Sequence, residues 1–153
     1  MPKDIANATK SKRQKLDSSP VLTEEEKKVV MIQYEKENDP EDAEVLLTEY
    51  LKFMRIKIEG KATDKCAPPR RIDEMWHAHI LSTNQYFAFC DRHNSGVYIH
   101  HDPSLENVPT RYELTLRRYA ELFGYIPKDE CIWPLPEEQS ESEDGDHYDP
   151  SCG

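Results

Sequence analysis

The stretch that organises the chain reads Arg-Ile-Asp-Glu-Met-Trp-His-Ala-His-Ile-Leu over residues 71–81. A second histidine-containing stretch, Val-Tyr-Ile-His-His-Asp-Pro, follows at residues 97–103. Five of the six histidines lie between positions 77 and 101, and Cys90 lies in the same window. Imidazole and thiolate are the side chains that bind zinc most readily. This window is therefore where the sequence predicts chemistry or a metal site.

Upstream of this stretch, hydrophobic residues recur at three- and four-residue spacing, which is typical of helices buried on one face. Residues 23–26 (Thr-Glu-Glu-Glu) have the pattern of a capping box and predict a helix that runs to about residue 36. A second helix is expected to begin with Asp39 as its N-cap and Pro40 in its first turn, and Gly60 should end it.

Downstream, the spacing predicts a helix over residues 71–81 and another with Thr83 as its N-cap, which Asn-Ser-Gly at 94–96 should end. Pro109 should open the last helix and Gly124 should close it. The expected fold is all-α: one small bundle of about five helices, with a short irregular or extended segment that carries the His-His pair.

The charge of the 153-residue chain divides it into three parts. Residues 1–20 are basic and should be a disordered arm, and residues 21–136 hold the helical domain. Residues 137–153 contain seven acidic residues and no Lys or Arg, which predicts a disordered acidic tail. The net charge of −10 disfavours nucleic acid as a partner, because binding to phosphates needs a basic face.

The sequence shows neither a signal peptide nor a run of about 18 apolar residues that could span a bilayer. We therefore expect an intracellular protein that is not secreted and has no membrane partner. In a reducing compartment the four cysteines should be thiols. Cys66, Cys131 and Cys152 fall in expected loops or tails and carry no predicted role.

The basic arm contains a hexamer that resembles short monopartite nuclear-import signals of the Myc type: Lys12, Arg13, Gln14, Lys15, Leu16 and Asp17. An extended strand of this kind places its basic heads in acidic pockets of an import receptor, and the leucine adds an apolar contact. The hexamer predicts an import receptor as a partner and a nuclear or nucleocytoplasmic location. The alternative is a solvated basic tail.

Residues 40–135 resemble the conserved domain of the glycine-rich-domain-containing-protein-like family. The resemblance rests on Trp-His-Ala-His-Ile-Leu at 76–81, Cys90, and His-His-Asp-Pro at 100–103. Glu-Tyr-Leu-Lys-Phe at 49–53 and Ile-Trp-Pro at 132–134 extend it. The chain lacks the glycine-rich region that names that family. The resemblance implies a small, mostly helical domain and no particular reaction.

The candidate metal ligands come from three segments: Asp73, His77, His79, Cys90, His100 and His101. On a helix, residues 77 and 79 point about 200° apart, so they cannot both face one ion. Asp73 and His77 share a face and suit a carboxylate–imidazole pair. Only one of the His-His pair should join, because neighbours in an extended segment point to opposite sides.

Three interpretations of this cluster stay open. The first is an interaction module with an unknown protein partner, in which the cluster is a candidate structural zinc site. The second is a small metal-dependent hydrolase that uses three ligands and a water. The third is a set of buried His and Cys anchors without metal. A Cys–His nucleophile pair, Cys90 with His77 or His100, is a further catalytic alternative. No other signature of an enzyme is present, which favours the interaction module.

Overall fold

The computed structural model describes residues 19–60 and 65–136, and these residues form a bundle of α-helices without β-strands. The five helices of this part are α2 (Glu24–Glu35), α3 (Ala43–Glu59), α4 (Arg70–Leu81), α5 (Thr83–His93) and α6 (Val108–Phe123). The all-α prediction is confirmed. Within the described residues, no helix has the length and apolar character needed to cross a membrane.

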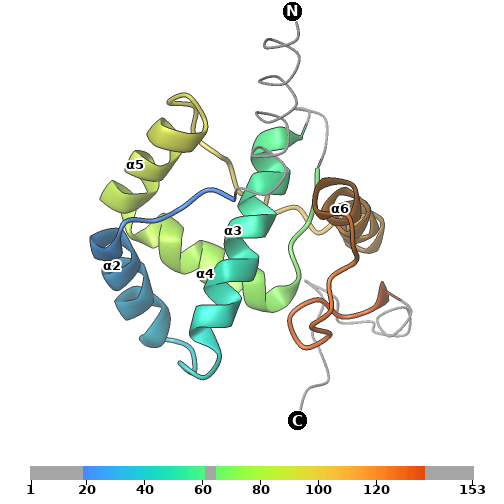
Figure 1. Cartoon of the computed structure of the whole chain (residues 1–153), viewed down its shortest axis with the longest axis horizontal. Helices are drawn as coiled ribbons and strands as arrows, with labels where there is room; N and C mark the ends of the chain where they lie inside the picture. The colour runs from blue at the N-terminus through green and yellow to red at the C-terminus, as the bar shows by residue number, and fades with distance from the viewer. Residues whose placement is uncertain (1–18, 61–64, 137–153) are drawn as a thin grey trace, which may run out of the picture.

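Helix α3 runs through the middle of the bundle, with α2 and α5 to one side of it and α6 to the other (Figure 1). Helix α4 contacts α2, α3 and α5, and α6 packs on α3. The core between these helices is rich in aromatic rings, and the largest side chains with under 2% of their surface exposed include Trp76, Tyr50, Tyr86, Phe53 and Phe89. Helix α4 therefore lies where three other helices meet, and it carries the stretch at 71–81.

The capping box at the start of α2 is confirmed. The Thr23 hydroxyl accepts the backbone N–H of Glu26 at 3.2 Å, and the Glu26 carboxylate accepts the N–H of Thr23 at 2.8 Å. The same carboxylate forms an ion pair with Arg92 of α5, also at 2.8 Å. The first turn of α2 is thus joined to the last turn of α5.

Helix α3 begins at Ala43, three residues later than the proline pattern predicts. The Asp39 carboxylate accepts the backbone N–H of Glu41 at 2.9 Å and closes a local turn, which competes with helix formation. The N-cap is Asp42, which takes a left-handed conformation with φ 60°. Gly60 ends the helix as expected.

The remaining ends agree with the sequence to within a residue. The N-cap of α5 is Ser82, and Thr83 is the first helical residue, so the predicted cap is displaced by one position. Pro109 lies in the first turn of α6, and Gly124 closes this helix with φ 81°. A left-handed φ of this kind is the conformation that favours glycine after a helix.

The predicted domain spans 21–136, and the described residues 19–60 and 65–136 pack around one core. The basic hexamer and the acidic tail lie outside the described residues. Cys66 is buried in the core, which sequence reasoning missed because it assigned this cysteine to a loop without a role. Neither Cys66 nor Cys90 forms a disulfide.

Candidate functional site

Three of the six candidate ligands come together on the surface of α4: Asp73, His77 and His101. Their potential ligand atoms all lie within 4.8 Å of one another. The Asp73 Oδ1 atom lies 2.5 Å from His101 Nε2, and the Oδ2 atom of the same carboxylate lies 3.7 Å from His77 Nε2. We call this group the His-Asp cluster. One carboxylate therefore faces both imidazoles, one oxygen toward each.

The geometry of helix α4 explains why Asp73 and His77 lie together in the cluster. Asp73 and His77 are four residues apart on α4, so they project from the same face about 40° apart. The Asp73 side chain is 13% exposed, while that of His77 is 55% exposed. The cluster therefore has a sheltered carboxylate beneath an imidazole that reaches solvent.

His101 lies in the connection between α5 and α6, and two buried hydrogen bonds hold that connection in place. The Trp76 indole N–H donates to the Tyr86 hydroxyl at 2.9 Å, and this hydroxyl donates to the carbonyl oxygen of Ile99 at 2.5 Å. The His101 ring then packs on Trp76, with ring centroids 4.5 Å apart, and on His77 at 4.8 Å. Trp76 and Tyr86 thus position the ligand that the chain contributes from outside α4.

A pocket of about 320 Å³ opens beside the cluster. Asp73, His77 and His101 line it together with other residues that include Ser104 and Arg111. The Arg111 guanidinium donates to three backbone carbonyls, those of Lys65 at 2.9 Å, Ser104 at 2.9 Å and Glu106 at 3.2 Å. It thereby holds the loop that contains Ser104, one of the residues that line the pocket.

His79 does not join the cluster, and its side chain is fully buried on the opposite side of α4. Its Nδ1 atom lies 2.7 Å from the Tyr50 hydroxyl, and its ring packs edge-on against Tyr86 and Phe89. Burial lowers the pKa of His79 to about 4, and the Gln85 backbone, which acts to raise this pKa, offsets burial only in part. His79 is therefore a neutral core residue at pH 7.

Cys90 and His100 also lie apart from the cluster. Cys90 is 2% exposed, and burial raises the pKa of its thiol, although the Ile99 backbone and the Tyr86 hydroxyl act to lower it. A protonated, buried thiol does not suit the nucleophile of the Cys–His pair. His100 is exposed, and its ring packs on Tyr98 with centroids 4.9 Å apart. The candidate set of six therefore divides into a cluster, two core residues and one surface residue.

The donor set of the cluster fits a divalent transition-metal ion. Bonds of about 2.0–2.1 Å in a tetrahedral site separate neighbouring ligand atoms by about 3.3 Å. The separations from the two Asp73 oxygens are 2.5 Å and 3.7 Å, and the ligand atoms of the cluster spread over up to 4.8 Å, so the side chains would have to shift to share one ion. A set of three protein ligands matches the number in open, catalytic sites, in contrast to the closed, four-ligand sites of structural zinc.

Sequence reasoning assigned no site role to the other lining residues of the pocket, including Ser104 and Arg111. Neither belongs to a metal-ligand pattern, and Arg111 lies in a helix that the spacing placed only by its apolar face. The one available signal was the polar run at 102–107 directly before that helix. Such a run marks a loop, but it does not tell which site the loop covers.

Comparison with known proteins corrects the resemblance drawn from sequence motifs. A family model matches residues 12–135, and it is that of the UCP032817-like family, not the glycine-rich-domain-containing-protein-like family. The shared short motifs were therefore not specific enough to identify the family. No curated protein and no solved structure matches the chain. The family is uncharacterised, so it assigns no reaction or ligand. Because the model covers most of its length, the chain belongs to the UCP032817-like family.

Proposed function

We propose that this domain binds one divalent transition-metal ion, zinc in the first place, through Asp73, His77 and His101, and that the ion serves metal-assisted hydrolysis. The observation that carries the proposal is the convergence of three ligand atoms within 4.8 Å at the edge of a 320 Å³ pocket. Three protein ligands with an open side are the arrangement of catalytic zinc sites.

The solvent access to the His-Asp cluster favours a catalytic zinc site over a structural one. Cys90, the thiolate that would complete a closed four-ligand site, is buried elsewhere with Tyr86 and the Ile99 backbone. The His77 imidazole is half exposed and borders the pocket, so small molecules can reach its side of the cluster. When bound in such a site, zinc lowers the pKa of its water to about 7 and polarises carbonyl or phosphoryl oxygens.

The protein's own residues would then have distinct tasks. Asp73 and His77 supply ligands from a rigid helix, and Trp76 and Tyr86 hold the backbone that presents His101. Arg111 holds the neighbouring lining of the pocket in place through its three carbonyl contacts. The alternative without metal remains a simple anchor, in which the Asp73–His101 hydrogen bond ties the connection to α4.

The test compares two histidines that differ in their place relative to the cluster. The full chain, purified without an affinity tag, is expected to contain stoichiometric zinc by elemental analysis. His77→Ala should weaken zinc binding at least about 100-fold, because an ion loses one of three protein ligands. His100→Ala, an exposed histidine outside the cluster, is the matched control and should bind zinc as the wild type does.

Two results would overturn the proposal. One is the absence of stoichiometric zinc, iron or manganese together with unchanged folding in chelator, which leaves the anchor alone. The other is equal zinc affinity in both variants. Hydrolysis itself is checked with ester and phosphate-ester reporter substrates, and any activity must disappear in chelator and in His77→Ala. Ferrous iron accepts the same ligand set, and the elemental analysis identifies it.

We also propose that Lys12, Arg13, Lys15, Leu16 and Asp17 act as a nuclear-import signal bound by an import receptor. The support is the sequence pattern alone, since these residues lie outside the described part of the chain.

In a fluorescent fusion too large to diffuse into the nucleus, Lys12→Ala combined with Arg13→Ala should shift the protein to the cytoplasm. Lys3→Ala with Lys10→Ala removes the same charge from the same arm and should leave the distribution unchanged. Equal nuclear levels in both variants would refute the signal.

A further inference from the structure

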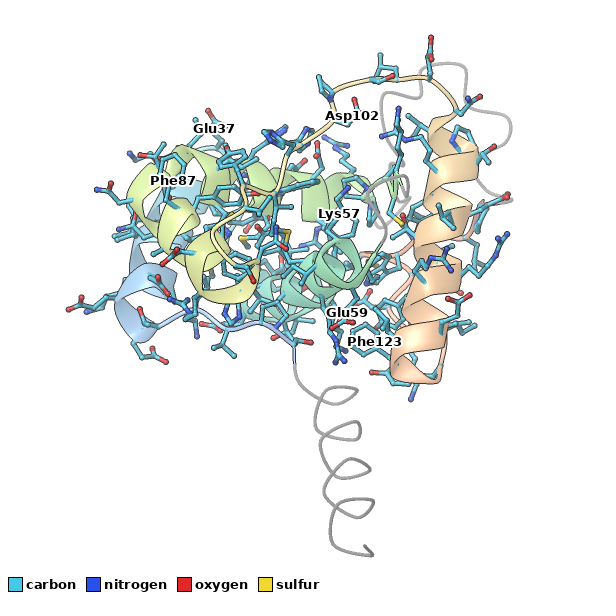
Figure 2. All side chains as sticks on the ribbon, turned by 90° about the horizontal axis from the view of Figure 1, so that it is seen from above. Glu37, Lys57, Glu59, Phe87, Asp102 and Phe123 are labelled. Atoms are coloured by element: carbon cyan, nitrogen blue, oxygen red, sulfur yellow. The ribbon has the colours of Figure 1, made fainter. Side chains whose placement is uncertain are left out.

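The pocket beside the His-Asp cluster has an apolar lining in addition to the candidate metal ligands. Five of its lining residues are apolar: Ala67, Pro68, Pro103, Leu105 and Val108. Pro103 and Leu105 belong to the connection that leads from α5 to α6, on which Figure 2 labels Asp102. The metal ligands and an apolar surface therefore border the same cavity.

The backbone around the apolar lining has few polar groups left for a ligand. The N–H of Ala67 donates to the carbonyl oxygen of Arg111 at 3.3 Å, and the carbonyl oxygen of Ala67 accepts the Thr115 hydroxyl at 2.7 Å. Pro68 and Pro103 have no backbone N–H. These residues therefore offer a bound molecule mainly apolar surface.

The three other polar side chains of the lining are engaged within the protein. The Arg111 guanidinium donates to three backbone carbonyls, and its Nη2 atom lies 3.8 Å from Asp102 Oδ2. Asp102 Oδ1 accepts the N–H of Ser104 at 2.9 Å. The Ser104 hydroxyl accepts the N–H of Glu106 at 3.2 Å. An anionic group in this part of the pocket would compete with these contacts, whereas an apolar group leaves them in place.

Burial and volume limit the size of such a group. Ala67 and Val108 are 4% and 5% exposed, whereas Leu105 is 58% exposed, so a molecule in the pocket would cover apolar surface that water now contacts. Covering that surface favours binding of an apolar group. The volume of about 320 Å³ lies at the lower end of the range for ligand pockets, which favours a short group.

We infer, on the basis of the proposed function, that the pocket takes the short aliphatic acyl group of a carboxylic ester or amide, with the scissile carbonyl at the His-Asp cluster. Water adds to the carbonyl carbon, and the bond from that carbon to the leaving oxygen or nitrogen breaks. The leaving atom takes up a proton from the water. Leu105 and Val108 determine which acyl group is accepted and take no part in these bond changes.

A series of esters with one leaving group tests the length of the acyl chain. 4-Nitrophenyl acetate, propionate and butyrate differ by one methylene at each step. For the zinc-loaded full chain, kcat/KM should rise about fourfold per methylene, because each methylene leaves water for an apolar surface. Leu105→Ser should reduce the ratio of kcat/KM for butyrate to kcat/KM for acetate at least about threefold. Its zinc content should stay at the wild-type level.

The matched control is Leu81→Ser. Leu81 is 60% exposed, about as much as Leu105, and it does not line the pocket. This variant should keep the wild-type ratio of butyrate to acetate hydrolysis.

Alkyl hydroxamates test the same pocket without turnover, because a hydroxamate binds zinc through its two oxygens and carries an alkyl chain beside them. In calorimetry, butyrohydroxamate should bind the zinc-loaded protein at least about tenfold more tightly than acetohydroxamate. Val108→Thr replaces a methyl group by a hydroxyl at nearly unchanged shape and should reduce this difference.

Each failure has a separate signature. With zinc bound, equal kcat/KM for the three esters or a wild-type butyrate preference in Leu105→Ser overturns the acyl pocket and leaves the metal site intact. Zinc-loaded protein that hydrolyses no ester but binds butyrohydroxamate more tightly contradicts hydrolysis and supports the apolar pocket. Absence of zinc binding overturns the proposed function, and the substrate class falls with it.

Discussion

His77 and His79 are two positions apart, and the helix sends them into opposite environments. The His77 imidazole is half exposed beside Asp73, while His79 is fully buried against Tyr50. The spacing predicted this separation, because two residues on a helix turn through about 200°. It could not tell which of the two would face the core, since both have apolar neighbours in the sequence.

The buried His79 makes stability depend on pH. Its pKa is about 4 in the folded protein, against about 6.5 in the unfolded chain. Between these values the unfolded chain binds a proton that the folded protein does not. The free energy of unfolding should therefore fall as the pH drops from 6.5 to 4, by about 3 kcal/mol from this group.

Urea unfolding at pH 7 and at pH 4.5 measures this effect in the wild type and in His79→Leu. The variant loses the contact with Tyr50 and should be less stable at pH 7, but its stability should fall less on acidification. The carboxylates titrate equally in the wild type and in the variant. The two proteins should therefore differ in the stability that they lose between pH 7 and pH 4.5 only through His79. If His79→Leu loses as much stability between pH 7 and pH 4.5 as the wild type does, this histidine is not the group that titrates.

At the residue scale, sequence reasoning also left His100 and His101 as alternatives. The segment that carries them is not helical, and no periodicity fixes which side chain turns inward. The hydrogen bond from Tyr86 to Ile99 and the packing of His101 on Trp76 decide the outcome. Both contacts join residues from separate segments, which the local pattern cannot reveal.

Helix ends were predictable where a local pattern specifies them. The capping box of α2 and the glycine that closes α6 follow from neighbouring residues alone. The predicted start of α3 was wrong, because Asp39 and Pro40 suit both a helix start and a turn. The Asp39 carboxylate closes a turn with Glu41 instead. The burial of Cys90 was also predictable, because Cys90 follows Tyr86 by four residues on the buried face of α5.

Helices α3 and α6 are joined through one sheltered carboxylate. Glu49 Oε1 accepts hydrogen bonds from the Tyr119 hydroxyl and from the Trp133 indole N–H, both at 3.0 Å. Its Oε2 atom lies 2.9 Å from the Lys52 ammonium, and the Glu49 side chain is 12% exposed. This single group therefore ties α3 to α6 and to the segment that follows α6.

Removing this carboxylate should loosen the contact between the two helices. Glu49→Ala leaves the Tyr119 hydroxyl and the Trp133 indole N–H without this acceptor and the Lys52 ammonium without its carboxylate, and we expect a loss of about 3 kcal/mol in the free energy of unfolding. Glu49→Gln keeps one acceptor oxygen and should lose less. Glu59→Ala, an exposed glutamate at the end of the same helix, should change stability by no more than about 0.5 kcal/mol. Denaturant unfolding measures all three, and equal stability of Glu49→Ala and Glu59→Ala would contradict the assigned role.

At the scale of the whole molecule, the sequence predicted the fold class better than it predicted the site. The number and type of helices follow from apolar spacing, which is local information. The site depends on which segments meet: α4 with the connection at 97–103 through His101, and that connection with α6 through the Asp102–Arg111 pair. Pairings of this kind are set by the packing of the core.

The link between Asp73 and His101 spans 28 residues of the chain. An ion held by both would act as a cross-link that closes a loop, and it would restrict the unfolded chain much as a disulfide does. A loop of that length corresponds to about 3–4 kcal/mol in the chain-entropy account of such links. Helix α5 lies entirely within this loop, and α6 lies outside it. With an ion bound, α4, α5 and the histidine connection would thus stay together as a unit even when α6 detaches.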